Sequence, residues 1–487
     1  MESIAYVEDL RLTFPGDQPL LFKDVSCHIK KGEKILILGP SGCGKSTLLQ
    51  VLCGIIPNSI EVPMKVKKQQ IPEEWGYVFQ NPDTQFCMPY VDEELAFVLE
   101  NLQIPRNQME ERIKRLLVQV GLELEDIHTN IQTLSGGMKQ RLAIASSLAL
   151  EPDVLFLDEP TAMLDPVGTK EIWEVIKKIG GDKTLIIVEH KLEDVLEIVD
   201  RVILFNEAGE IMADGLKAEV FSRYKNLMLE QGIWYPGFWD HFVQNFEWSE
   251  RKVPQVTNPP SIGLKKFKGY RQKKERINIH DIQVYPGEWI VIKGKNGAGK
   301  STLLHSLMQF IKTTGRYSLF GDIVTHSKRL DKHMAFVFQN PELQFVTNSV
   351  VEEIAYSLRI EKRNEREISK TVEELLQIFQ LKKHQNKHPY QLSMGQKRRL
   401  SVAASIVRGQ QILLLDEPTF GLDLKNTFAL LTLLEKYRQK NKTIIMVSHD
   451  ERIEANFATR VWMIEDGKLI KDLFPDGTKV KRCIVPV

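Results

Sequence analysis

Two glycine-rich segments carry the residue types that bind phosphate. GPSGCGKST spans 39–47 and GKNGAGKST spans 294–302, and both fit the pattern G-x-x-x-x-G-K-[ST]. Glycines let backbone N–H groups wrap around phosphate oxygens, and a helix that starts there adds the positive end of its dipole. The lysine of such a loop reaches the β- and γ-phosphates, and the next hydroxyl binds Mg²⁺. We expect these nucleotide-binding residues: Gly39, Pro40, Ser41, Gly42, Cys43, Gly44, Lys45, Ser46 and Thr47, then Gly294, Lys295, Asn296, Gly297, Ala298, Gly299, Lys300, Ser301 and Thr302. Cys43 has two interpretations, a small filler of the loop or a thiol whose pKa the helix N-terminus lowers.

Paired acidic residues follow an apolar run in each half of the chain. VLFLDEPT spans 154–161 and ILLLDEPT spans 412–419, so Asp158 and Asp416 are predicted to end buried strands. A hard cation such as Mg²⁺ prefers carboxylate and water oxygens, which suits both aspartates. The next residues, Glu159 and Glu417, are close enough to polarise an attacking water.

A Ser-Gly segment opens a predicted helix in each half, as LSGGM at 134–138 and LSMGQ at 392–396. Serine at a helix start is a common N-cap, and the same geometry also makes an anion site. Both interpretations stay open. The candidate residues for a second phosphate contact are Ser135, Gly136, Gly137, Ser393 and Gly395.

Short apolar runs must hold these loops in place. The runs at 34–39, 154–158, 184–188, 289–294, 412–416 and 443–447 are typical of buried parallel strands, and helical stretches such as 46–54 and 139–150 follow. Open parallel sheets bind ligands at the carboxyl ends of their strands, where the motifs lie. The predicted fold class is α/β, with two tandem domains that each have a mostly parallel sheet, flanking helices and a helical subdomain.

The motifs recur in unchanged order at an offset of about 255–259 positions, which indicates a duplicated domain. We expect domains at 1–222 and 263–487, joined by a segment at 223–262 whose end, VPQVTNPP, is typical of a linker. The first part of this segment is rich in aromatic residues. Either it caps the first domain or it contacts a partner or a membrane surface. Its aromatic members are Trp234, Tyr235, Phe238, Trp239, Phe242, Phe246 and Trp248.

Composition narrows the class of protein. The chain has 487 residues with 65 Lys+Arg against 64 Asp+Glu, a net charge of +1, so the basic excess typical of a nucleic-acid binder is missing. The five cysteines form no C-x-x-C pair, which favours a reducing compartment. We expect neither a signal peptide nor a membrane-spanning run.

Together these motifs resemble the ATPase domains of ABC transporters, in both halves. The resemblance implies that ATP and Mg²⁺ are the cofactors, and that the halves pair head to tail within one chain with two ATP molecules between them. It implies water-activating roles for Glu159 and Glu417, and γ-phosphate contacts from His190 and His449. Each site would also receive the signature serine and glycines of the other half. Further residues implied by the family pattern are Gln80 and Gln339 at the nucleotide and metal, Asp165 and Asp423 in loops that cross the interface, and Phe14 and Tyr270 as aromatic residues that stack on adenine. The metal set would be Ser46, Gln80 and Asp158, and Ser301, Gln339 and Asp416.

Three methionines depart from the family pattern. Met138 replaces a glutamine and Met394 a glycine of the signature, and Met163 replaces a small residue. A methionine in place of glycine adds bulk where backbone approaches phosphate. We therefore expect two hydrolysing sites of unequal rate, with the site completed by Ser393 slower.

The repeated FQNPxxQF, at 79–86 and 338–345, further resembles the ATPases of energy-coupling-factor importers, which take up vitamins or transition metals. That family implies docking on a transmembrane coupling subunit and a membrane-embedded substrate-binding subunit, without nucleic acid, at the cytoplasmic face of a bacterial membrane. The acidic residues expected at this docking surface, unless they form only a solvated face, are Asp83, Glu93, Glu94, Glu342, Glu352 and Glu353. Alternatives are a fused ATPase of a sugar importer, a soluble ABC translation factor acting on ribosomes, and a chromosome or repair ATPase. Thiamine precursors, other vitamins, cobalt and nickel all remain open as substrates.

Overall fold

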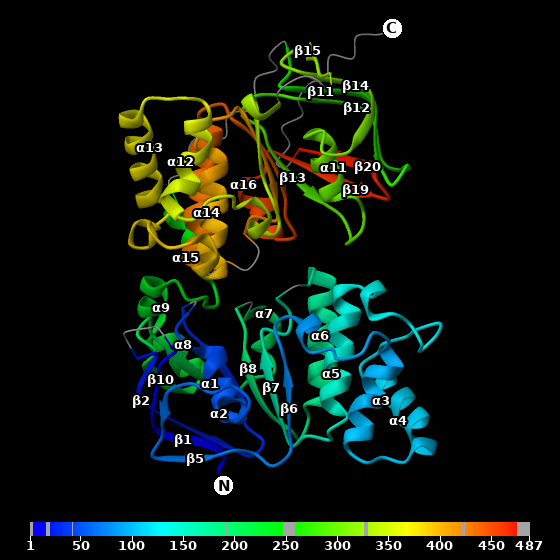
Figure 1. Cartoon of the computed structure of the whole chain (residues 1–487), viewed down its shortest axis with the longest axis vertical. Helices are drawn as coiled ribbons and strands as arrows, with labels where there is room; N and C mark the ends of the chain where they lie inside the picture. The colour runs from blue at the N-terminus through cyan, green and yellow to red at the C-terminus, as the bar shows by residue number, and fades with distance from the viewer. Residues whose placement is uncertain are drawn as a thin grey trace. The chain divides into compact units, whose positions relative to one another are not determined.

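A computed structural model describes residues 3–15, 20–40, 42–162, 164–190, 192–246, 259–325, 330–419, 422 and 424–474. The chain divides into two compact units, Met1–Phe238 and Trp239–Val487. Each unit has the predicted α/β fold, so the fold class is confirmed (Figure 1). Within the described residues, no helix is both long enough and apolar enough to cross a membrane.

The first unit contains two sheets. A six-stranded sheet has the order β10-β9-β3-β8-β7-β6, and a smaller antiparallel sheet pairs β1 with β2, β4 and β5. The strands are β1 Ser3–Leu12, β2 Phe22–Lys30, β3 Lys34–Leu38, β4 Met64–Lys65, β5 Lys68–Gln70, β6 Trp75–Val78, β7 Val154–Asp158, β8 Thr184–Val188, β9 Arg201–Phe205 and β10 Ile211–Leu216. The helices are α1 Lys45–Leu52, α2 Ile55–Asn58, α3 Val91–Asn101, α4 Arg106–Gln119, α5 Gly136–Leu148, α6 Pro166–Ile179, α7 Leu192–Val195, α8 Lys217–Arg223 and α9 Lys225–Gln231.

The second unit joins both kinds of pairing in one ten-stranded sheet, β15-β14-β11-β12-β20-β19-β13-β18-β17-β16. Its strands are β11 Ile262–Arg271, β12 Lys274–Val284, β13 Trp289–Lys293, β14 Lys312–Leu319, β15 Asp322–Ile323, β16 Met334–Val337, β17 Ile412–Asp416, β18 Thr443–Val447, β19 Arg460–Glu465 and β20 Lys468–Leu473. Its helices are α11 Lys300–Leu307, α12 Val350–Ile360, α13 Glu365–Ile378, α14 Met394–Ile406, α15 Leu424–Gln439 and α16 Glu451–Phe457.

The parallel strands form the core of each unit. Every residue of β7, β8, β17 and β18 is buried, as expected for strands covered by helices on both faces. The six runs that the sequence predicted as buried strands correspond to β3, β7, β8, β13, β17 and β18. In Figure 1 the helices α3, α4 and α5 lie together at one side of the first unit, and α12, α13 and α14 form the matching group in the second. Each group is the expected helical subdomain.

The aromatic segment does not cap the first unit throughout. Helix α10, Phe238–Asn245, spans the boundary between the units. From Trp239 onward the rings pack within the second unit: Trp239 and Phe242 lie 4.7 and 4.0 Å from the ring of Phe428, and Phe246 lies 5.7 Å from Phe457. The interpretation as a cap of the first domain is therefore wrong for this part, because these rings pack against Phe428 of α15 and Phe457 of α16. Trp248 lies outside the described residues.

Candidate active site

The phosphate loop of each unit connects a buried strand to a helix. The loop at 39–44 leads from β3 into α1, and the loop at 294–299 leads from β13 into α11. The N-cap glycines, Gly44 and Gly299, have φ of 99° and 102°, a conformation that favours glycine. A Cβ on Gly44 would also lie 2.7 Å from the ring of Phe22. Local geometry therefore requires glycine at this turn, as the motif predicts.

The phosphate-loop lysines are held above their own loops. Lys45 Nζ donates to the carbonyls of Gly39 and Pro40, both at 2.9 Å, and is 6% exposed. Lys300 Nζ makes the equivalent bonds at 2.8 and 3.0 Å. An ammonium group in this place can exchange backbone carbonyls for phosphate oxygens without moving far. Thr47 and Thr302 lie in the first turns of α1 and α11, and Ser41 lies outside the described residues.

A serine and an aspartate form a pair of oxygen donors in each unit. Ser46 Oγ donates to Asp158 Oδ1 at 2.8 Å, and Ser301 Oγ donates to Asp416 Oδ1 at 3.1 Å. Burial raises the pKa of both aspartates to about 6; the serine hydrogen bonds lower it and the neighbouring glutamates raise it. Such buried carboxylates gain from a cation, so the donor set fits Mg²⁺.

No group of three or more His, Cys, Asp or Glu that could hold a metal occurs in the part of the chain that the structure describes. The donors fit an ion shared with nucleotide phosphates, as Mg²⁺ usually is. Bound there, Mg²⁺ would neutralise charge on the phosphate oxygens.

In each unit the predicted water-activating glutamate lies between two other predicted site residues. Glu159 accepts a hydrogen bond from Gln80 Nε2 at 2.7 Å on one carboxylate oxygen, and His190 Nε2 lies 3.1 Å from the other. In the second unit the Gln339 and His449 nitrogens are each 3.3 Å from the Glu417 carboxylate. Three residues that are distant in sequence therefore meet at the ends of β6, β7 and β8, and of β16, β17 and β18.

The two glutamates share an uncommon backbone conformation. Glu159 has φ of 46° and Glu417 has φ of 47°, and their N–H groups donate to Val188 and Val447 on the neighbouring strands. Positive φ is rare for a residue with a long side chain and is found at functional sites. Burial opposes ionisation of both glutamates, but the adjacent histidines and lysines keep the pKa of each below its ordinary value. A glutamate that stays ionised can accept a proton from water.

The signature serines are N-caps. Ser135 Oγ accepts from Met138 N at 3.3 Å, and Ser393 Oγ accepts from Gln396 N at 3.4 Å. Gln396 also accepts from Ser393 N, so α14 has a reciprocal capping box and Met138 cannot form one for α5. Gly136, Gly137 and Gly395 lie in the first turns of these helices. A role at a second phosphate stays a prediction.

Other predicted site residues have clear places. Phe14 follows β1 and packs against the core of the first unit, and Tyr270 lies on β11 with its hydroxyl 3.3 Å from Thr314 Oγ1. Asp165 is the N-cap of α6 and accepts from Gly168 N at 2.8 Å. Asp423 and Met163 lie outside the described residues.

The interpretation of Cys43 as a reactive thiol is wrong. Cys43 is 1% exposed, and burial raises its pKa even though Lys45 and backbone N–H groups act in the opposite direction. A Cβ on Gly39 would lie 2.7 Å from its sulfur, so the thiol fills the space under the loop. A small filler is therefore its role.

Two of the acidic residues expected at a docking surface are internal. Glu94 is 2% exposed and accepts from the N–H groups of Cys87 and Met88, and Glu353 is 4% exposed and accepts from Val346 and Thr347. The docking prediction is wrong for both, because they hold the loops before α3 and α12. The other members of this set are exposed (Asp83 and Glu93) or half-buried (Glu342 and Glu352). Asp83 pairs with Lys139, Glu342 with Lys397 and Glu352 with Arg359.

Tyr77 and Arg398 were not among the predicted site residues. Tyr77 Oη donates to Asp158 Oδ2 at 3.1 Å, and buried Arg398 donates to the Phe338 carbonyl at 2.7 Å next to Gln339. A comparison of the two repeats would have identified both positions. Tyr77 in YVFQNP corresponds to a phenylalanine in FVFQNP, and Arg398 in KRRL corresponds to a glutamine in KQRL.

This fold and these loops define a duplicated P-loop ATPase. The chain matches the ABC transporter family at residues 22–162 and again at 277–420, and it belongs to that family. It is the ATP-hydrolysing, ATP-binding component of a transporter, as the motif resemblance predicted.

Relatives match over almost the whole length. A putative ABC transporter ATP-binding protein of Methanosarcina acetivorans is 35% identical over 96% of this chain and 85% of that protein. The putative HMP/thiamine import ATP-binding protein YkoD of Bacillus subtilis is 33% identical over 97% of this chain and 92% of that protein. The solved structure of cbiO1 from Clostridium perfringens, described as part of the ABC transporter complex cbiONQ, is 27% identical with a TM-score of 0.41, over 44% of this chain and 89% of that one.

Proposed function

We propose that this chain is the energy-coupling ATPase of an energy-coupling-factor-type importer for a vitamin or a transition metal ion. The observation that carries the proposal is the FQNPxxQF segment, which has the same structural role in both units. The likeness to a protein named for HMP and thiamine import supports the importer class, and it favours keeping a thiamine precursor as a candidate substrate. A fused sugar-importer ATPase is disfavoured because both halves keep the full segment.

Each polar residue of this segment makes its own connection. Gln80 reaches Glu159, Asn81 caps a 3-10 helix by accepting from Asp83 N, and Gln85 Nε2 donates to the Ala143 carbonyl of α5 at 2.9 Å. The second unit repeats these connections through Gln339, Asn340 and Gln344. A displacement of this segment by a docked partner would therefore be transmitted to both the water-activating glutamate and the signature helix.

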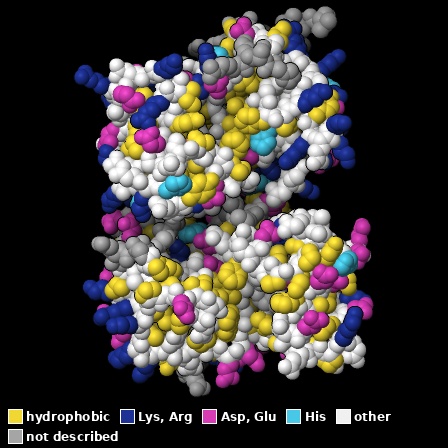
Figure 2. Space-filling view, viewed as in Figure 1, with side chains coloured by type: hydrophobic (Ala, Val, Ile, Leu, Met, Phe, Trp, Pro, Cys, Tyr) yellow, Lys and Arg dark blue, Asp and Glu magenta, His cyan; other side chains and the backbone are white. Residues whose placement is uncertain are grey.

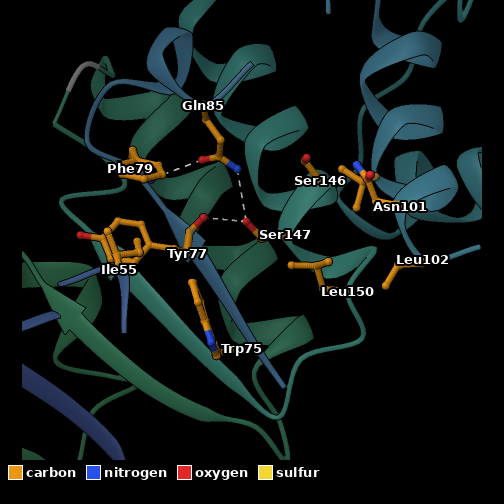
Figure 3. Close-up of a pocket in the computed structure, with 11 residues that line it drawn as sticks. Ile55, Trp75, Tyr77, Phe79, Gln85, Asn101, Leu102, Ser146, Ser147 and Leu150 are labelled. Carbon is orange, nitrogen blue, oxygen red and sulfur yellow. Dashed lines mark hydrogen bonds between the residues drawn. The ribbon is translucent and has the colours of Figure 1, made fainter. Parts of the chain in front are cut away.

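A groove of about 350 Å³ lies beside the segment in the first unit. Figure 3 shows Ile55, Trp75 and Phe79 on one wall, with Leu102 and Leu150 toward the other. In Figure 2 hydrophobic side chains gather over β6 on this face of the unit. Leu102 and Leu150 are 41% and 39% exposed, so the rim offers apolar area to a partner. We assign this groove to an apolar segment of the transmembrane coupling subunit.

The matching surface of the second unit has different chemistry. Phe310, at the position of Ile55, stacks on Phe338 with ring centres 5.9 Å apart and an angle of 6°. At the position of Leu150 stands Arg408, which pairs with Glu361 and Asp331. The two units thus favour two unlike docking segments, which a single asymmetric membrane subunit can supply.

The ATPase assignment is tested by Glu159→Gln and Glu417→Gln. Each variant should bind ATP with nearly unchanged affinity and lose most of the turnover of its own site. Measurements of phosphate release and of binding of a fluorescent ATP analogue separate the two effects. Full turnover in either single variant would contradict the role of that glutamate.

The docking assignment is tested by co-purification with the membrane proteins encoded beside this gene. Leu150→Arg should abolish recovery of the membrane subunit while ATP binding persists. Val118→Arg, at a 75% exposed position of α4 outside the groove, is the matched control. Equal recovery with both variants would reject the groove, and co-purification with ribosomes would favour a translation factor.

A further inference from the structure

The two catalytic centres differ at two buried positions that the repeat makes equivalent. Tyr77 on β6 corresponds to Phe336 on β16, and Gln140 on α5 corresponds to Arg398 on α14. All other predicted side chains around the carboxylates are the same in both units: lysine, serine, glutamine, aspartate, glutamate and histidine. These two exchanges distinguish the surroundings of the carboxylates; the phosphate loops differ as well, with Lys295 and Ala298 where the first unit has Pro40 and Cys43.

In the first unit, the metal-binding aspartate is surrounded by neutral donors. Asp158 accepts from Ser46 on Oδ1 and from the buried Tyr77 hydroxyl on Oδ2. Gln140 is 2% exposed and uncharged, and its Nε2 has no hydrogen-bond partner within the described ranges. Lys45 is the cation that lowers the pKa of Asp158, against the effect of burial.

In the second unit, Ser301 still donates to Asp416, but a buried cation, Arg398, stands where the first unit has Gln140. Phe336 has no hydroxyl to offer Asp416, and Arg398 is 2% exposed. The charge of Arg398 acts on both Asp416 and Glu417. Burial lowers the pKa of Arg398 to about 10, against the opposing effect of the two carboxylates, so the guanidinium keeps its charge at pH 7.

Arg398 also fixes the loop that carries Gln339. Its Nη1 donates to the Phe338 carbonyl at 2.7 Å, one residue before Gln339, while its Nε has no hydrogen-bond partner among the described residues. A buried orphan donor is unusual and calls for an explanation. The side chain joins the signature helix α14 to the loop at 338–340 by a hydrogen bond, and its charge acts on the carboxylates at the end of β17.

We propose that Arg398 is a positioning residue of the second centre: its buried charge, set against Asp416 and Glu417, makes this centre bind Mg²⁺ more weakly than the first. The inference rests on the proposed role of Asp416 as a metal ligand. The positive charge of Arg398 repels Mg²⁺ and attracts the negative polyphosphate of ATP. Removal of this charge should therefore strengthen Mg²⁺ binding and weaken metal-free ATP binding, two effects of opposite sign.

The test uses the whole chain with one centre silenced. Lys45→Ala leaves the second centre as the one that binds nucleotide, and Lys300→Ala leaves the first. In each background, a fluorescent ATP analogue reports binding during titration with Mg²⁺ and, separately, in EDTA. Electron paramagnetic resonance of free and bound Mn²⁺ gives metal affinity without reliance on turnover.

In the Lys45→Ala background, Arg398→Gln should lower the Mg²⁺ concentration for half-saturation about tenfold, the scale for a buried charge acting on a divalent ion. Arg398→Lys, which keeps the charge and loses the forked hydrogen-bond geometry, should stay within twofold of the parent. In the Lys300→Ala background, Gln140→Arg should raise the half-saturating Mg²⁺ concentration. The Gln140→Arg variant also tests the inference if Arg398→Gln does not fold.

Three results would overturn the inference: an unchanged or raised half-saturation with Arg398→Gln, the same behaviour in Arg398→Lys and Arg398→Gln, or no effect of Gln140→Arg. The second result would assign the effect to lost packing rather than charge. Failure of both backgrounds to bind Mg-ATP would instead reject the proposed sites themselves, which keeps the two failures distinguishable.

Discussion

Asp158→Asn should stabilise the metal-free protein while it abolishes hydrolysis in the first unit. Asp158 is buried at the end of β7 with hydrogen bonds from Ser46 and Tyr77. Asparagine has nearly the same shape and can keep both partners, because its oxygen accepts from the serine and its amide can donate to the tyrosine oxygen. What the substitution removes is the cost of a buried negative charge.

The pKa of Asp158 gives the magnitude. Burial raises it from 3.8 to about 6, with a further rise from Glu159 that the hydrogen bonds of Ser46 and Tyr77 oppose. A difference of about two units at about 1.4 kcal/mol each is about 3 kcal/mol at pH 7. The pKa of Asp158 is higher in the folded protein than in the unfolded chain, so protonated Asp158 stabilises the fold. This stabilisation is fully present below about pH 4 and is lost as pH rises through 6. Asparagine escapes the loss, so its advantage is about 3 kcal/mol at pH 7 and about half that at pH 5.

Differential scanning calorimetry in EDTA without nucleotide measures the effect. For a unit of this size, about 3 kcal/mol corresponds to a rise in melting temperature of about 6–12 °C. Asp153→Asn, at an exposed ion pair with Lys31, is the matched control and should shift melting by little. Asp416→Asn should reproduce the effect in the second unit. A wild-type melting temperature for Asp158→Asn at pH 7, or an equal gain at pH 5 and 7, would refute the reasoning.

Three further predictions concern single side chains. Glu94→Gln should cost about 1–3 kcal/mol in urea unfolding because its carboxylate holds two backbone N–H groups of the loop before α3, whereas exposed Glu93→Gln should be nearly neutral; equal losses would contradict this. Iodoacetamide should label exposed Cys87 and spare buried Cys43 in the native protein, as peptide mass spectrometry can show, and rapid labelling of both would refute the filler role. Phe428→Ala should destabilise the second unit by about 3–5 kcal/mol, since its ring anchors helix α10; a change under 1 kcal/mol by calorimetry would show that α10 adds no stability there.

The parallel strands could be predicted because their burial leaves a local mark. A strand covered on both faces needs an unbroken apolar run, and these runs lead directly into the phosphate loops and the Asp-Glu pairs. Family resemblance assigned Gln80, Glu159 and His190 to one nucleotide site, and the structure brings the three side chains together; their roles toward nucleotide and metal stay predictions. Glu94 and Glu353 were misjudged because an acidic helix start looks the same in sequence whether it faces solvent or caps a loop.

The sequence by itself determined the duplicated α/β fold, the phosphate loops and the class of reaction, because these depend on local patterns of glycine, charge and apolar residues. Tertiary structure decided which charges act on which site. In the sequence, Arg398 looks like any other basic residue of α14. Its burial in the fold makes its charge act strongly on Asp416 and Glu417. Likewise, the aromatic segment shows no preference for either unit in its composition, and Trp239 packs on Phe428 because of the helix that carries it. Burial and proximity between distant segments set the strength of an electrostatic interaction, and neither is written in local sequence.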